Sequence, residues 1–101
     1  MKNRQQRLRQ ALKLTELMQD KAETGQWQAV IELEKQRDAV LAGVLPLPEA
    51  EVTSTVQTLL RALIDSNAAV ESQAREQKQA VLQQLNTLSA NKYAIAHYTT
   101  E

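Results

Sequence analysis

The sequence contains 101 residues, with 12 Lys plus Arg, 12 Asp plus Glu, one His and no Cys. This length suits one domain, so we expect residues 1–101 to form a single helical unit. The lack of cysteine excludes disulfides, thiolate metal sites and a cysteine nucleophile. The balanced charge gives no general reason to expect a polyanionic partner or an anionic membrane.

The composition favours an all-α protein. The chain has two Gly, two Pro, one Trp and no Phe, whereas strands draw on β-branched and aromatic residues and need turn formers between them. No apolar run approaches the roughly 20 residues that cross a bilayer, and the charged start is not followed by the apolar stretch of a secretory signal. We therefore expect a helical, cytoplasmic protein without a membrane span.

Residues 4–23 and 26–42 carry the pattern of two amphipathic helices. Apolar residues recur at steps of three and four along both segments; in the first they are Leu8, Ala11, Leu12, Thr15, Met18 and Ala22. Thr24-Gly25 is a helix stop signal, because glycine accepts the left-handed backbone that closes many helices. The two segments are predicted to form an antiparallel hairpin.

Two side chains of the second segment are expected to act as structural anchors. Trp27 begins the apolar stripe and is interpreted as a core residue at the bend. Arg37 occupies a position on the same stripe. We expect its stem to lie along apolar surface and its guanidinium to pair with Glu16 or Asp20 across the hairpin.

A third helix is predicted from about residue 49 to residue 90. Pro46 and Pro48 interrupt the helical pattern, and no Gly or Pro follows them. At about 1.5 Å per residue this helix measures about 60 Å, roughly twice the length of either earlier helix. The hairpin is therefore expected to pack on one half of the long helix. The alternative is a break at Ser66-Asn67, which gives a compact four-helix bundle.

The uncovered half of the third helix is predicted to bind a cargo protein. An apolar seam interrupted by polar residues suits a reversible contact better than a permanent core. The residues assigned to this surface are Val70, Ala74, Gln77, Val81, Leu85 and Leu88. A short C-terminal helical segment is expected after Ser89. Its side chains Tyr93, Ile95 and Tyr98 are expected to dock on the same surface as an autoinhibitory tail.

No motif for catalysis or metal binding stands out. The single histidine, His97, cannot form a two-histidine zinc site, and the sequence lacks HExxH, P-loop, GxGxxG and GxSxG patterns. We therefore expect neither an enzyme nor a bound cofactor. No aromatic residue lies among the first basic residues to stack on a base, which disfavours direct nucleic-acid binding. These basic residues are Lys2, Arg4, Arg7, Arg9 and Lys13.

The stretch around the predicted bend resembles a known family pattern. Gly25-Gln26-Trp27, then Val30, Leu33-Glu34 and Arg37, are similar to the G-x-W-x-x-[aliphatic]-x-x-L-E-x-x-R pattern of the FliT family of flagellar export chaperones. The order of parts is also similar, with a hairpin, a proline-bearing loop, a long helix and a carboxyl segment containing Asn91-Lys92-Tyr93.

This resemblance implies a cytoplasmic chaperone. It would bind the C-terminal helical segment of the filament cap protein FliD, prevent its premature assembly and pass it to the type III export apparatus. The family also implies contacts with the export ATPase and, in some bacteria, with the flagellar master transcription regulator. A carboxyl-terminal helix that shields the binding surface until cargo displaces it is a further implied feature.

Two other functions remain open at this level. The long helices of two copies could pair along the same seam as a structural homodimer without cargo. Alternatively, the chain could be a FlgN-type chaperone for the hook–filament junction proteins, because that related family has similar amphipathic helices.

Overall fold

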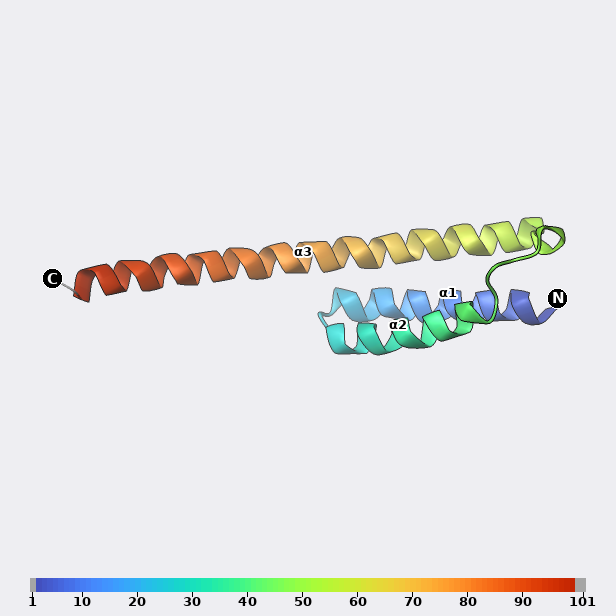
Figure 1. The fold of residues 1–101 in the computed structure, drawn as a ribbon, viewed down its shortest axis with the longest axis horizontal. Helices are drawn as coiled ribbons and strands as arrows, with labels where there is room; N and C mark the ends of the chain where they lie inside the picture. Colours follow the sequence, from blue (N-terminus) through green and yellow to red (C-terminus); the bar gives the residue numbers. More distant parts are fainter. Residues whose placement is uncertain (1, 100–101) are drawn as a thin grey trace.

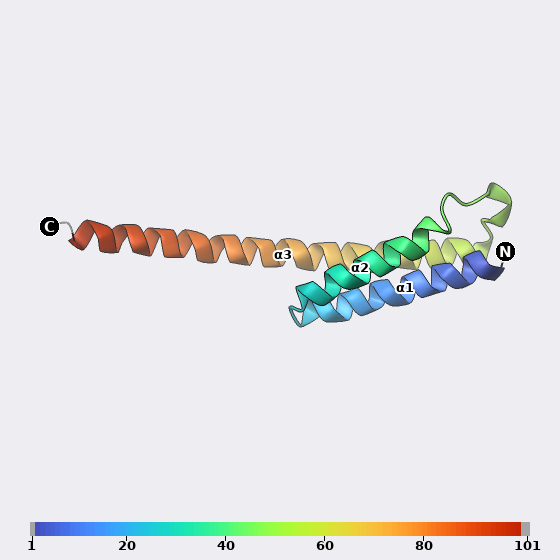
Figure 2. The ribbon, with the colours of Figure 1, turned by 60° about the horizontal axis from the view of Figure 1, so that its bottom comes forward.

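Three α-helices and one short 3₁₀ helix make up the fold. The computed structural model describes the backbone of residues 2–99 and the side-chain environments of residues 3–88. The elements are α1 (Lys2–Glu23), α2 (Trp27–Ala42), η1 (Glu49–Glu51) and α3 (Ser54–Thr99). The antiparallel α1–α2 hairpin packs on the first half of α3, and the second half of α3 continues alone (Figures 1 and 2). This arrangement confirms the predicted all-α class and the hairpin on a long third helix.

The hairpin bend is closed by a glycine in the left-handed conformation. Gly25 has a φ of 72°. Its N–H donates to the Ala22 carbonyl at 3.1 Å, and the Gln26 N–H donates to the Lys21 carbonyl at 2.9 Å. This pair of bonds is the Schellman arrangement, which satisfies carbonyls left free at a helix end. The stop signal Thr24-Gly25 thus turns the chain back so that α2 starts at Trp27.

The core consists of two apolar clusters at opposite ends of the hairpin. Near the bend, the buried side chains are Met18, Ala22, Val30 and Val70. Near the interhelical loop they are Leu8, Val44 and Val56. Between them lie the fully buried Ala11 and Thr15 of α1, and the Thr15 hydroxyl donates to the Ala11 carbonyl at 2.8 Å. α1 therefore supplies small, satisfied side chains where it packs against both other helices.

The loop between α2 and α3 is held by the basic start of α1. The Arg4 guanidinium donates to the Glu51 carboxylate and forms an ion pair with it. The Arg7 guanidinium donates to the Gly43 carbonyl at 3.5 Å. Two of the five basic residues that open the chain thus contact the loop within the same molecule.

The third helix begins five residues later than the sequence pattern predicts. Residues 49–51 form only the 3₁₀ turn η1. The Thr53 hydroxyl then accepts a hydrogen bond from the Val56 N–H at 3.2 Å, which is the bond of an N-cap residue. The predicted start at residue 49 is wrong because Thr53 provides the cap.

α3 is continuous through both places where the sequence suggested an interruption. The helix passes Ser66-Asn67 without a break, so the alternative of a compact four-helix bundle is wrong. The backbone also remains helical to Thr99, so the predicted helix end near residue 90 is wrong and residues 91–99 extend α3. The side chains of Tyr93, Ile95 and Tyr98 lie outside the described side chains.

The core packing predicts the effect of removing a buried leucine. Leu8 is 0% exposed, whereas Leu17 on the same helix is 42% exposed. We expect Leu8→Ala to lower the free energy of unfolding by about 3 kcal/mol, because the cavity cost adds to the lost burial. Leu17→Ala should lower it by less than about 1 kcal/mol. Urea denaturation monitored by circular dichroism measures both, and equal losses would contradict this core.

The bend predicts a graded series at Gly25. No atom lies within 4 Å of a Cβ built on Gly25, so its positive φ is the only obstacle to a side chain. We expect Gly25→Ala to destabilise the protein by about 1 kcal/mol, and Gly25→Asn to cost less because asparagine tolerates this conformation better. Thermal unfolding of both variants tests the order. A loss for Asn as large as the loss for Ala would argue against a conformational cause.

Candidate partner-binding surface

The second half of α3 exposes apolar side chains that no other helix covers. In the described part of the chain, the last buried residue of α3 is Val70, and α3 continues beyond the hairpin in both ribbon views (Figures 1 and 2). We call residues 75–88 the α3 arm. Four large apolar side chains of the arm are exposed by 41–63%: Val81, Leu82, Leu85 and Leu88. They form an apolar surface of the kind that binds partners.

Most of the residues predicted to bind cargo lie on this exposed part of α3. Ala74 and Gln77 are exposed together with the three predicted arm residues Val81, Leu85 and Leu88. Val70 differs, because it is only 6% exposed and packs with Met18 and Val30. The hairpin reaches further along α3 than predicted, so Val70 belongs to the core of the protein.

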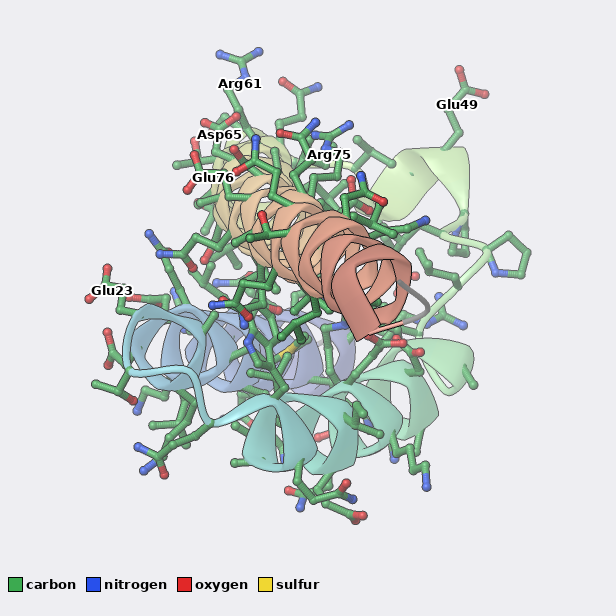
Figure 3. All side chains as sticks on the ribbon, turned by 90° about the vertical axis from the view of Figure 1, so that its left-hand side faces the viewer. Glu23, Glu49, Arg61, Asp65, Arg75 and Glu76 are labelled. Atoms are coloured by element: carbon green, nitrogen blue, oxygen red, sulfur yellow. The ribbon has the colours of Figure 1, made fainter. Side chains whose placement is uncertain are left out.

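The opposite side of α3 is charged. Figure 3 shows Arg61, Arg75 and Glu76 pointing from α3 away from the hairpin. A partner helix that buries apolar surface is therefore expected on the side of α3 that follows the hairpin, not on this charged side.

A groove between α2 and α3 continues along the hairpin. We call it the α2–α3 groove. It consists of two adjoining hollows of about 310 and 300 Å³. The first, near the bend, is lined by Met18, Trp27, Val30, Ile31, Glu34, Arg37, Asn67, Val70, Glu71 and Ala74. The second is lined by Arg37, Leu41, Leu63, Ile64, Asn67, Ala68 and Glu71.

Arg37 crosses the α2–α3 groove where the two hollows meet. Its Nη1 donates to the Asn67 side-chain oxygen at 2.6 Å, and its Nη2 lies 3.0 Å from the Asp38 carboxylate. The Asn67 amide in turn donates to Glu71 at 3.2 Å. The expected pairing with Glu16 or Asp20 is wrong, because the guanidinium points to α3 instead of across the hairpin.

Trp27 lies at the open end of this groove. It is half-buried and packs against the cluster that contains Met18, Val30 and Val70. Within the described residues its buried indole N–H has no hydrogen-bond partner. Trp27 thus contributes both to the core beside the bend and to the wall of the groove.

The groove on the other side of α3 is more polar. It lies between α1 and α3 and is lined by Leu12, Glu16, Gln19, Ala62, Asp65, Ser66 and Ala69. The Ser66 hydroxyl donates to the Gln19 side-chain oxygen at 3.1 Å. With Asn67 bonded to Arg37, the two residues expected to weaken α3 instead fix it to both helices of the hairpin.

Three exposed apolar residues of this surface were not assigned to it from the sequence. Ile31 and Ile64 lie beside the apolar stripes of their helices, and they are 47% and 65% exposed on the groove. Leu82 lies beside the three-four stripe. The sequence could have indicated Leu82, because a large apolar residue next to Val81 widens the apolar side of the part of α3 that the hairpin does not cover.

Metal-ligating side chains are not gathered at the exposed apolar surface of the described residues. No group of three His, Cys, Asp or Glu side chains among them is arranged to hold a metal ion, and His97 lies outside the described side chains. No helix in residues 2–99 combines the length and hydrophobicity needed to cross a membrane.

Comparison with known proteins agrees with this architecture. The family model described as flagellar protein FliT matches residues 5–100. No curated protein and no solved structure matches the chain. The match covers nearly all of the hairpin, the loop and the whole of α3, so the chain belongs to the FliT family, a family of flagellar export chaperones.

Proposed function

We propose that this protein is a cytoplasmic chaperone that binds the C-terminal helical segment of the filament cap protein FliD. It keeps that segment from assembling early and passes FliD to the type III export apparatus. The observation that supports this proposal is the exposed apolar side of the α3 arm, where Val81, Leu82, Leu85 and Leu88 follow one another within eight residues.

An amphipathic helix is the cargo that this surface suits. A helix buries an apolar stripe against apolar residues three and four positions apart on its partner, as in other helix-in-groove complexes. Such a contact hides the same stripe through which the cargo would assemble with its own copies. Each large apolar side chain contributes up to about 1.5–3 kcal/mol when fully buried.

Release requires that this contact remain reversible. The arm interleaves its apolar residues with Gln77, Gln83 and Gln84, which are exposed in the free protein. Interfaces that form and separate keep polar groups which are solvated in both states. Contacts with the export ATPase and with a flagellar transcription regulator are proposed from the family alone.

A charge in the middle of the arm tests the cargo site. Val81 is 41% exposed, so Val81→Asp should leave the fold intact. We expect it to weaken binding of a FliD C-terminal peptide at least about tenfold, because a carboxylate desolvated against an apolar stripe costs more than about 1.4 kcal/mol. Isothermal calorimetry measures the affinity.

Leu17→Asp is the matched control for this experiment. The side chain of Leu17 is 42% exposed, about as much as that of Val81, but it lies on α1. Its substitution should change the affinity less than about twofold, since surface changes outside a contact have small effects. If Val81→Asp loses helical content in circular dichroism together with binding, Val81 is part of the core and the proposed site is wrong.

The autoinhibitory role of Tyr93, Ile95 and Tyr98 is a separate proposal. A shield would require the chain to bend between the arm and these residues, because one straight helix does not fold onto its own side. If the tail shields the arm, deleting residues 92–101 should tighten FliD binding in calorimetry. Unchanged or weaker binding would exclude the shield and favour a tail that lengthens the binding surface.

A further inference from the structure

The α3 arm repeats the side of α3 that lines the α2–α3 groove. Eighteen residues make about five turns of an α-helix, so residues eighteen apart point in the same direction, about 27 Å apart along the axis. By this spacing Val81 lies in line with Leu63, Leu82 with Ile64, Leu85 with Asn67, and Leu88 with Val70. All four earlier residues line the α2–α3 groove.

The other groove continues into a polar side of the arm. The four α3 residues that face α1 are Ala62, Asp65, Ser66 and Ala69. Eighteen residues later stand Ala80, Gln83, Gln84 and Thr87, which line a shallow, open hollow on the arm together with Leu88. Val81, Leu82 and Leu85 are thus aligned with the α2 side of the hairpin, whereas Leu88 also borders the hollow on the α1 side.

We propose that the α2–α3 groove and the apolar side of the arm form one continuous track for a single amphipathic helix of a partner protein. From Ile64 to Leu85 the track is about 32 Å long, which requires an occupant helix of at least about 22 residues. This inference rests on the proposed chaperone function and specifies the form of its cargo.

Charged side chains along the track determine which charged residues a bound helix should carry. In the groove the exposed charged side chains are Glu34 and Glu71, and the Arg37 guanidinium there is already bonded to Asp38 and Asn67. On the arm, Lys78 follows beside the apolar residues. Complementarity therefore selects a helix with Lys or Arg beside its apolar stripe over the groove, and Asp or Glu beside it over the arm.

Trp27 lies where the groove opens onto the arm. It borders the hollow near the bend together with Ala74, and α3 continues from there without the hairpin (Figure 1). A helix that occupied only the groove would leave the arm uncovered, and one that bound only the arm would leave Ile31 and Ile64 exposed. One straight helix along Ile64, Leu82 and Leu85 would cover exposed apolar residues of both parts.

The test uses one variant for each part of the track. Ile64→Asp changes the groove and Leu85→Asp changes the arm; these side chains are 65% and 52% exposed, so both variants should fold. Each should weaken binding of the FliD C-terminal helical peptide at least about tenfold in calorimetry. Leu17→Asp is the control for both. Loss of affinity with only one of the two variants would overturn the continuous track.

Two altered peptides show whether one helix contacts both parts. In each, the apolar residues of one half of the FliD helix are replaced by alanine, which preserves helical propensity. One peptide should become insensitive to Leu85→Asp and remain sensitive to Ile64→Asp, and the other should show the reverse. The same response of both peptides to both variants would contradict the proposal.

A designed peptide separates this inference from the identity of the cargo. It has 22 residues, an apolar stripe, Lys in one half and Glu in the other. If FliD does not bind but this peptide binds with the same sensitivity to both variants, the track stands and the proposed cargo is wrong. Failure of both peptides overturns the track. A wild-type dimer in light scattering that both variants dissociate would assign the track to a second copy of this chain and also overturn the proposal.

Discussion

The difference in length between α3 and the hairpin is the constraint on which this structure depends. α3 has 46 residues, whereas α1 has 22 and α2 has 16. The apolar pattern of α3 does not stop where the hairpin stops, so the same side of one helix serves first as core and then as exposed surface. Apolar side chains left in water are a standing free-energy cost that a partner removes. The free chain retains this cost, and binding of the proposed partner would remove it.

Polar contacts determine how the arm is directed relative to the hairpin. Ser66 bonds to Gln19 of α1, and Asn67 bonds to Arg37 of α2. These two adjacent residues are fixed from both sides, at the last level of α3 before the core ends near Val70. Apolar packing alone tolerates small rotations of a helix, whereas paired hydrogen bonds specify one orientation. The groove and the arm are aligned because the rotation of α3 is fixed here.

The fold could be predicted from the sequence more completely than the site. The hairpin and the long helix could be predicted from three features of the sequence. These are the helical periodicity, the stop signal at Gly25 and the absence of Gly or Pro after Pro48. The start of α3 could not be placed, because a threonine hydroxyl at residue 53 competes with a plausible proline start. The exposure of Ile31 and Ile64 could not be predicted, because periodicity identifies an apolar face without showing where α2 and α3 separate. The contact of the Arg37 guanidinium with Asn67 also depends on the distance between α2 and α3, so it could not be predicted either.

The spacing along α3 limits how this protein can change over evolution. Substitutions between Val70 and Val81 occur on exposed turns and alter little of the core. Insertion or loss of one residue there would rotate the distal apolar residues by about 100° around the axis, away from the side that α2 faces. Changes of seven or eleven residues would nearly restore the angle. Homologous chains are therefore expected to differ in the length of α3 by about seven or eleven residues, and seldom by a single residue.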